Sequence, residues 1–270
     1  MNDSRVITVE SIEKAFPRAL SGWRALLQPV AKPTETALSG ISFHVGAGEA
    51  VALMGPNGAG KSTLLRILAT LIIPTRGRAT LGGVDVERNS AKARQQFGYH
   101  TGGDEGFYTR LTARANLTFF ASMNNITGSH AGERIAKVSE WMGLGDDLDR
   151  QVRTLSTGMT HRLGLARAML HEPGILLLDE PTRSLDPVAA SEFRRLLKDE
   201  IVRREGTTLL FASHTPREVE EIADRVVLLD EGRVVADETP QRLCASAGTH
   251  TLDEAIGRLV RNPVHAGSVQ

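Results

Sequence analysis

The sequence GPNGAGKST, residues 55–63, decides the fold of this chain because it matches the phosphate-binding pattern GxxxxGK followed by Ser or Thr at every position. It follows a short apolar run of buried-strand type, residues 50–54, and it precedes residues 62–68, which have the pattern of a helix. A strand, a glycine loop and a helix in this order direct backbone N–H groups and a helix N-terminus toward one anionic group. A chance glycine loop is the alternative, and the correct order of the three elements argues against it.

The residues of this loop have distinct expected roles. Gly55, Gly58 and Gly60 let the backbone wrap tightly around a phosphate. Lys61 is expected to place its charge between the β- and γ-phosphates, and the Ser62 hydroxyl to bind Mg²⁺. The other loop residues expected to contact the nucleotide are Pro56, Asn57, Ala59 and Thr63.

The composition limits the classes of protein to which the chain can belong. The 32 Lys and Arg residues balance 32 Asp and Glu residues, so the chain has no global basic field for nucleic acid or a membrane surface. A single cysteine, Cys244, excludes an internal disulfide and fits a reducing compartment. No apolar run approaches the roughly 18 residues that span a bilayer, and the first four residues lack a secretory pattern. We therefore expect any membrane role to depend on a partner.

Strand-like and helix-like segments alternate along most of the chain. The strand-like runs are residues 6–9, 40–45, 50–54, 175–178 and 207–212, with a closing hairpin over 226–236. The helical patterns cover residues 113–144, 163–170 and 189–204, whereas residues 17–36 have no periodicity and contain three prolines. This alternation predicts an α/β fold with a mostly parallel central sheet, an N-terminal antiparallel β subdomain and a helical insertion lobe over about residues 90–165.

A second motif follows the apolar run at residues 175–178. Asp179 and Glu180 come directly after it, at the edge of a parallel sheet where α/β proteins bind ligands. Asp179 is expected to hold Mg²⁺ through water, and Glu180 to polarise the water that attacks a γ-phosphate. An apolar run that ends in acids is a weak signal alone, but it is strong downstream of an intact phosphate-binding loop.

A third motif, LSTGM at residues 155–159, opens the predicted helix near residue 163. Ser156 and Gly158 can present unpaired N–H groups and the positive end of the helix dipole to an anion. Ordinary helix capping is the commoner role of such residues, so this motif does not identify a site by itself.

Taken together, these motifs resemble the nucleotide-binding domain of an ATP-binding cassette (ABC) transporter, over roughly residues 6–243. GPNGAGKST corresponds to the Walker A segment, LLLLDEP to Walker B, and LSTGM resembles the LSGGQ signature. Ser184-Leu185-Asp186 resembles the D-loop, and Ser213-His214 the switch histidine. The resemblance implies a P-loop NTPase in which two domains pack head to tail, each ATP lying between one P-loop and the signature helix of the other subunit.

The same resemblance implies roles for individual residues. Catalysis would depend on Lys61, Glu180 and His214, with Ser62 and Asp179 at Mg²⁺. Ser156 and Gly158 of the second subunit, together with Asp186, would complete the ATP site, and Phe16 would stack on adenine, a plain core Phe being the alternative. The ATPase domain would cover residues 1–243, and residues 244–270 would form a short C-terminal tail.

The chain departs from the family pattern in three places. The expected Q-loop Gln is absent: residues 97–108 read FGYHTGGDEGFY, so Asp104 or Glu105 is expected to substitute at Mg²⁺. In the signature, Thr157 replaces Gly and Met159 replaces Gln. The irregular residues 17–36 exceed the family minimum, and similar insertions and GGDE-type loops occur in exporters of drugs, lipids and polysaccharides. Phe107, Tyr108 and Leu111 suggest a socket for a membrane subunit's helix, with packing under the helical lobe as the alternative.

We therefore expect a cytoplasmic ATPase subunit, peripheral on the inner face of the cell membrane, that energises a separate transmembrane permease. The permease is expected to be an exporter. It would form a homodimer on ATP binding, or pair with a paralogous ATPase subunit, with ATP and Mg²⁺ as ligands and no nucleic acid. An importer subunit is one alternative. A non-transport ABC ATPase is a second, which the single cassette and neutral charge disfavour. A degenerate nucleotide sensor is the third, supported only by the missing Gln.

Overall fold

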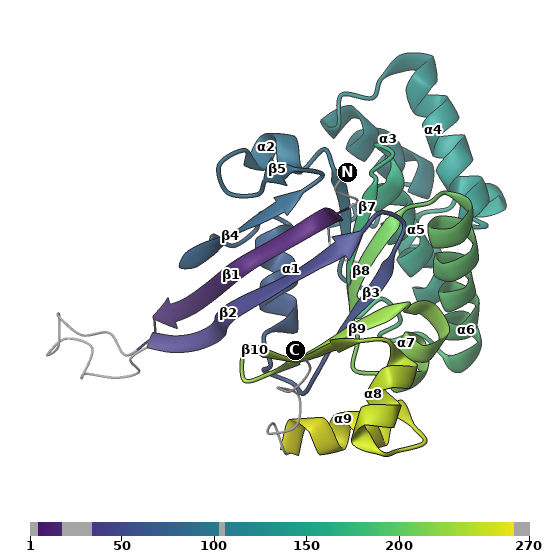
Figure 1. Cartoon of the computed structure of the whole chain (residues 1–270). Coiled ribbons are helices and arrows are strands. Elements are labelled where there is room, and N and C mark those ends of the chain that lie inside the picture. Colours follow the sequence, from purple (N-terminus) through teal and green to yellow (C-terminus); the bar gives the residue numbers. More distant parts are fainter. Residues whose placement is uncertain (1–4, 18–33, 103–105, 262–270) are drawn as a thin grey trace, which may run out of the picture.

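The computed structural model describes residues 5–17, 34–102 and 106–261, which form two sheets and a lobe of helices (Figure 1). The N-terminal sheet has the strand order β2-β1-β4-β5, and all its pairs are antiparallel. Its strands are β1 (Arg5–Pro17), β2 (Thr34–Gly46), β4 (Arg76–Leu81) and β5 (Val84–Asp85). This arrangement is the antiparallel β subdomain that the sequence predicts.

The central sheet has the order β10-β9-β3-β8-β7-β6. Its strands are β3 (Ala50–Met54), β6 (Phe97–His100), β7 (Ile175–Asp179), β8 (Thr208–Ala212), β9 (Arg225–Asp230) and β10 (Arg233–Glu238). All neighbouring pairs are parallel except β9 with β10, which form the closing hairpin. Every residue of β3, β7 and β8 is buried, because both faces of a parallel sheet are covered. The expected mostly parallel sheet is confirmed.

Alternate residues of these strands belong to two separate cores. On one face, Val51, Leu53 and Leu177 pack with α1 (Lys61–Leu68) and with the N-terminal sheet. On the other face, Ala52 and Leu178 pack with the helical lobe and the helices that follow β7 and β8. The P-loop, between β3 and α1, therefore lies where the two cores meet.

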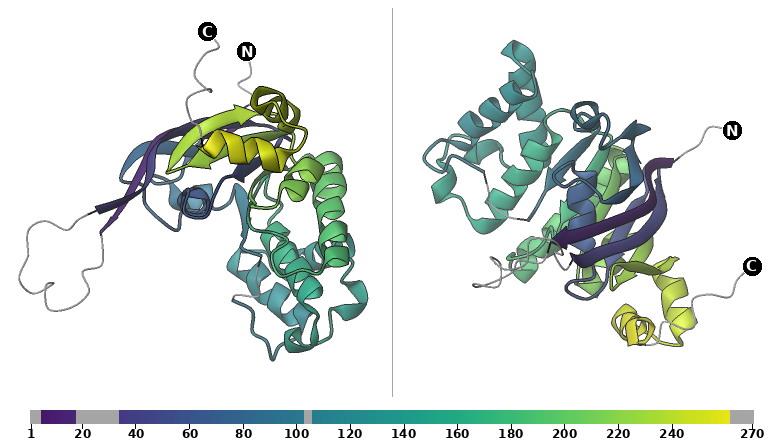
Figure 2. Two further views of the ribbon diagram at one scale, coloured as in Figure 1. Left: turned by 90° about the horizontal axis from the view of Figure 1, so that it is seen from below. Right: turned by 90° about the vertical axis from the view of Figure 1, so that its left-hand side faces the viewer.

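The helical lobe stands to one side of the two sheets (Figure 2). Its elements are α3 (Ala113–Met123), α4 (Gly128–Trp141), the short turns η2 (Gly145–Asp147) and η3 (Val152–Thr154), and α5 (Thr157–Met169). The single helical pattern over 113–144 forms two helices, because the chain reverses at Asn125, whose φ is 59°. The range expected for the lobe, residues 90–165, also contains α2 (Ser90–Ala93) and β6, and β6 is a strand of the central sheet.

The remaining helices cover the second face and the C-terminal end. They are α6 (Pro187–Arg195), the π-helix η4 (Leu196–Arg204), α7 (Pro216–Ile222), α8 (Pro240–Ala247) and α9 (Leu252–Arg261). Much of the expected C-terminal tail is thus helical, and Leu252 and Ala255 are fully buried. In the described ranges 5–17, 34–102 and 106–261, no helix has the length and apolarity to cross a bilayer.

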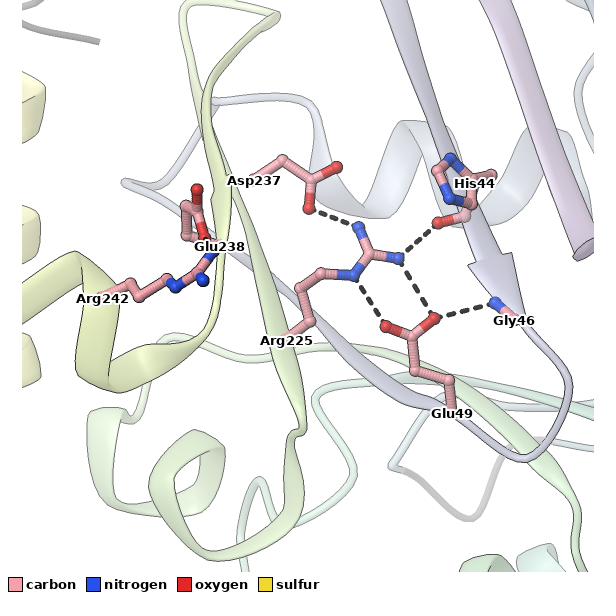
Figure 3. A network of polar contacts seen from close by, with 7 residues as sticks. All are labelled: His44, Gly46, Glu49, Arg225, Asp237, Glu238 and Arg242. Atoms are coloured by element: carbon pink, nitrogen blue, oxygen red, sulfur yellow. Dashed lines mark hydrogen bonds and ion pairs between the residues drawn. The ribbon is translucent and has the colours of Figure 1, made fainter. Parts of the chain in front are cut away.

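One polar network joins the two sheets, and Arg225 at the start of β9 is its centre (Figure 3). Its Nε donates to Glu49 at 2.7 Å, its Nη1 is paired with Asp237 of β10, and it also donates to the carbonyl of His44 in β2. The second carboxylate oxygen of Glu49 accepts from the backbone N–H of Gly46 at 2.8 Å. Despite burial, these bonds raise the pKa of Arg225 and lower that of Glu49.

Candidate functional site

The P-loop backbone has the shape that its glycines permit. Gly55, Gly58 and Gly60 have φ angles of 138°, 86° and 101°, which residues with a Cβ rarely adopt. A Cβ on Gly60 would lie 2.5 Å from the Leu38 side chain and 2.7 Å from the Ala37 carbonyl oxygen. The loop is thus fitted closely against β2, and α1 begins directly after it.

Lys61 is the first residue of α1, and its side chain turns back over the loop. Its Nζ donates to the carbonyl oxygens of Gly55 at 2.6 Å and Pro56 at 3.0 Å. Only 6% of the residue is exposed. Burial lowers the pKa of Lys61, and the negative charges of Glu180 and Asp179 oppose that shift. The ammonium group is therefore held close to two carboxylates at one end of the loop.

Asp179 and Glu180 lie near the P-loop because only β8 separates β7 from β3 in the central sheet, and the three strands end at the same edge. The Ser62 hydroxyl donates to Asp179 Oδ1 at 2.9 Å. An alcohol and a carboxylate oxygen at this distance are the donor set that the P-loop NTPases use for Mg²⁺, so these residues fit the ion.

Glu180 follows Asp179 in a left-handed conformation, with φ of 56°. Its backbone N–H donates to the carbonyl of Ala212, at the end of β8, at 3.0 Å. Its carboxylate is in contact with Nδ1 of His214, which lies two residues after β8. The backbone thus turns Glu180 toward His214 rather than into the sheet.

The P-loop and the acids Asp179 and Glu180 surround a cavity of about 400 Å³. Its lining includes Asn57, Gly58, Gly60, Lys61, Ser62, Thr63, Asp179 and Glu180. The structure therefore brings together most of the predicted P-loop residues and both Walker B acids. Four further residues of the lining were not predicted from the sequence: Ala37, Arg66, Thr101 and Arg183. Ala37 lies in β2 and Thr101 directly after β6, at positions that no local motif marks.

His214 borders a second cavity of about 370 Å³ on the other side of the P-loop, together with Gly55 and Pro56. The far wall of this cavity is α9, through Asp253, Ile256 and Val260. The C-terminal helix thus lies close to the P-loop, which the sequence did not indicate.

The predicted signature residues lie elsewhere. Ser156 caps α5, and its hydroxyl accepts from the backbone N–H of Met159 at 3.2 Å. Neither Ser156 nor Gly158 lines the P-loop cavity. Thr157 instead lines a separate cavity of about 270 Å³, with Ser184 of the D-loop segment. Within one chain, the signature motif and the P-loop therefore form two distinct surfaces.

Asp186 and Phe16 do not line the P-loop cavity either. The Asp186 carboxylate caps α6, accepting from the backbone N–H groups of Val188 and Ala189 at 3.0 Å each. Phe16, near the end of β1, is 37% exposed, with the Lys14 ammonium 5.0 Å from its ring centre. An exposed ring does not fit the alternative of a core Phe, and the stacking role stays a prediction.

The loop after β6 divides its aromatic residues between two environments. Phe107 is buried, and its ring packs against the Arg167 guanidinium at 4.7 Å and edge-to-face against Phe120. Tyr108 is 51% exposed and packs edge-to-face on Phe119 of α3. Asp104 and Glu105, expected to substitute for the missing Gln, lie outside the described residues, as do residues 18–33 of the irregular segment.

Comparison with known proteins gives a consistent result. The family model described as "ABC transporter" matches residues 38–183. The ABC transporter ATP-binding protein NatA of Bacillus subtilis is 36% identical over 204 residues, which are 76% of this chain and 82% of NatA. The daunorubicin resistance ATP-binding protein DrrA2 of Streptomyces coeruleorubidus is 37% identical over 227 residues, covering 84% and 70% of the two chains. The structure of cbiO1 from Clostridium perfringens, part of the ABC transporter complex cbiONQ, has a TM-score of 0.76 at 25% identity and covers 95% of each chain.

Proposed function

The chain belongs to the ABC transporter family, and on that premise we propose that it is the ATP-hydrolysing subunit of an exporter and acts as a dimer. The observation that carries the proposal is the cavity where the P-loop meets Asp179 and Glu180, with Glu180 in contact with His214. Retention of all these groups opposes the alternative of a degenerate nucleotide sensor, because a sensor needs no residue to activate water.

ATP binding follows from the P-loop geometry. The backbone N–H groups of the loop and the N-terminus of α1 bind the β- and γ-phosphates. Lys61 exchanges its contacts with the Gly55 and Pro56 carbonyl oxygens for phosphate oxygens. Ser62 and Asp179 hold Mg²⁺, which neutralises charge that develops on the phosphates. Phe16 contributes its ring face to the adenine base.

Hydrolysis depends on the pair of side chains at the ends of β7 and β8. Glu180 accepts a hydrogen bond from the attacking water and orients it toward the γ-phosphate. His214 holds the Glu180 carboxylate and stabilises charge on the γ-phosphate. The left-handed backbone at Glu180 costs free energy, and it brings this carboxylate to His214.

A second copy of the chain supplies the missing half of each site. Ser156 and Gly158 sit at the N-terminus of α5, where the helix dipole favours a phosphate, yet they lie outside the P-loop cavity of their own chain. In a head-to-tail dimer, each signature helix closes the cavity of the other subunit. Asp186, which caps α6, orders the D-loop that lies between the two sites.

A transmembrane permease docks on a surface of the helical lobe that we name the lobe patch: Tyr108, Phe119 and Met123. Their exposed fractions are 51%, 40% and 70%, and Phe119 and Met123 lie one helical turn apart on α3. Buried Asn116 holds the Tyr108 backbone at both its N–H (2.8 Å) and its carbonyl (3.1 Å), so the position of Tyr108 is fixed relative to α3. Similarity to drug-resistance ATP-binding proteins supports export, and docking would hold the subunit at the cytoplasmic face of the membrane.

The hydrolytic role is tested with Glu180→Gln, because Gln keeps the size of the side chain but is a poor base. Purified protein with Mg²⁺ and ATP should lose at least about 100-fold in phosphate release, within the usual range for a general base. Binding of ATP, followed by titration calorimetry, should be retained, and the variant should accumulate as an ATP-bound dimer in size-exclusion chromatography. Phosphate release at the wild-type rate would remove Glu180 from the mechanism.

The docking role is tested with Tyr108→Ala, with Leu71→Ala as the control. Leu71 is also exposed, at 63%, but lies in the loop after α1, outside the helical lobe. In membranes that contain the permease, Tyr108→Ala should lower transport and permease binding, while ATP binding by the isolated subunit stays unchanged. Normal transport by Tyr108→Ala, or an equal loss in Leu71→Ala, would contradict the assignment of the lobe patch.

A further inference from the structure

Glu218 is a buried acid that the proposed reaction does not use. It lies in the first turn of α7, four residues after His214, and only 1% of it is exposed. The hydroxyl groups of Ser213 and Thr182 are close enough to its carboxyl group to affect its pKa, whereas its Oε1 atom has no hydrogen-bond partner among the described residues. A buried carboxyl group that is not fully satisfied costs stability, so its presence needs an explanation.

The two neighbours of Glu218 belong to the two loops that carry the hydrolytic pair. Ser213 is fully buried between β8 and His214, and its hydroxyl accepts from the Thr215 backbone N–H at 3.0 Å. Thr182 lies two residues after Glu180, in the loop between β7 and α6. Glu218 therefore lies close to both loops, and it does not line the P-loop cavity.

Burial is the main reason that the pKa of Glu218 is raised. The Glu180 carboxylate adds to that rise, whereas the hydroxyl groups of Ser213 and Thr182 and the charge of Arg194 in α6 oppose it. Arg194 is itself occupied by an ion pair with Glu221.

We propose that Glu218 is a positioning residue for ATP hydrolysis, which holds the His214 loop against the loop after Glu180. The contact between His214 and Glu180 depends on the separation of these two loops. The Glu218 carboxyl group lies close to Ser213 of one loop and to Thr182 of the other. Loss of that carboxyl group would let His214 move relative to the carboxylate of Glu180. The inference rests on the hydrolytic role proposed above for Glu180 and His214.

The test compares three variants in α7. Glu218→Leu fills a similar volume without hydrogen bonds, Glu218→Gln keeps a donor and an acceptor, and Glu220→Gln is the control because Glu220 is exposed on the same helix. With Mg²⁺ and ATP, kcat of Glu218→Leu should fall at least about tenfold while the Kd for ATP changes by less than about twofold, since positioning of a base affects turnover. Glu218→Gln should stay within about threefold of wild type, and Glu220→Gln should match wild type.

A second experiment separates positioning from a general loss of stability. In the His214→Ala background, Glu218→Leu should lower kcat by less than about twofold, because residues that act through each other are not additive. Thr182→Val, which removes one hydroxyl at constant shape, should lower kcat in the wild-type background and not in the His214→Ala background. If Glu218→Leu does not fold, this pair of measurements takes its place.

Three results would overturn the inference: wild-type turnover in Glu218→Leu, equal loss in Glu218→Gln and Glu218→Leu, or full additivity with His214→Ala. These outcomes are distinct from failure of the proposed function. If Glu180→Gln is inactive and Glu218→Leu is normal, only the positioning role is lost. If Glu180→Gln hydrolyses ATP at the wild-type rate, the hydrolytic assignment and the inference fail together.

Discussion

The P-loop region and the signature region both offer backbone N–H groups and a helix N-terminus to a phosphate, yet they are built differently. The P-loop is held by contacts within its own chain: Lys61 folds over the loop, Ser62 contacts Asp179, and Gly60 packs closely against β2. In the signature region, the Ser156 hydroxyl makes its hydrogen bond within its own helix, to the Met159 N–H. The first region lines a cavity within its own chain, and we propose that the second becomes part of a site when a second copy approaches it.

The two glycines of these regions make the same contrast. Gly60 has a φ of 101°, and a Cβ there would overlap Leu38 and Ala37. A Cβ on Gly158 would lie 3.5 Å from the Ala189 side chain, an ordinary contact. The fold of this chain requires glycine at position 60 but not at position 158, where our proposal assigns the requirement to close approach of a partner and its nucleotide.

The largest expected effect separates binding from turnover. Lys61→Ala and Ser156→Arg should each lower ATP hydrolysis at least about 100-fold, because each removes one half of the charge stabilisation around the γ-phosphate. Only Lys61→Ala should weaken ATP binding to the isolated chain, measured by titration calorimetry below the concentration at which dimers form. If Ser156→Arg also loses binding by the monomer, the signature is not a separate half-site.

The next effect concerns stability rather than activity. Gly60→Ala should lower the free energy of unfolding by at least about 2 kcal/mol, since a left-handed conformation with a Cβ costs roughly 1–2 kcal/mol before the overlaps are counted. Gly158→Ala should be neutral or up to about 1 kcal/mol more stable, because Ala is the better helix former. Urea unfolding of both variants measures the difference. Equal destabilisation would show that position 158 is also constrained by the fold.

The smallest effect is the pH dependence of the Arg225 network, which holds the N-terminal sheet beside the P-loop region. The pKa of Glu49 is lowered by Arg225 and Gly46, so its contribution to stability is complete above its ordinary pKa of 4.5 and is lost as the pH falls through the lower folded value. Glu49→Gln should cost about 1 kcal/mol at pH 7, and its difference from wild type should vanish well below pH 4.5. Urea unfolding at both pH values checks this; a constant difference would mean that the carboxylate charge is not involved.

The sequence predicts those parts of the molecule whose causes are local. The P-loop, the apolar run of β7 and the Ser156 cap depend on neighbouring residues, and each lies where the pattern indicated. The break between α3 and α4 was not predicted, although Asn125 and Gly128 are residues that favour a turn and both have a positive φ. Phe107 and Tyr108 are adjacent and similar, so only the position of Arg167 and α3 decides which one is buried.

Contacts between distant segments could not be predicted from the pattern. The pair of Arg225 and Glu49 joins residues that are 176 positions apart, and charged residues usually lie in solvent. The burial of Glu218 could not be predicted either, because Glu218 is one of several acids in a helix that also has a solvent-exposed side. The contact of Glu180 with His214 followed from neither spacing nor composition, since it depends on β7 and β8 being adjacent in the sheet.

The central claim, that one active site combines the P-loop of one copy with the signature of another, is tested most directly by mixing two inactive variants. Lys61→Ala keeps an intact signature, and Ser156→Arg keeps an intact P-loop. In a mixed dimer, one site receives both mutations and the other receives none. An equimolar mixture at dimer-forming concentration should therefore regain about a quarter of the wild-type sites, by random pairing, and hydrolyse ATP well above either parent. A mixture as inactive as its parents, while mixed dimers are shown to form, would contradict the shared site.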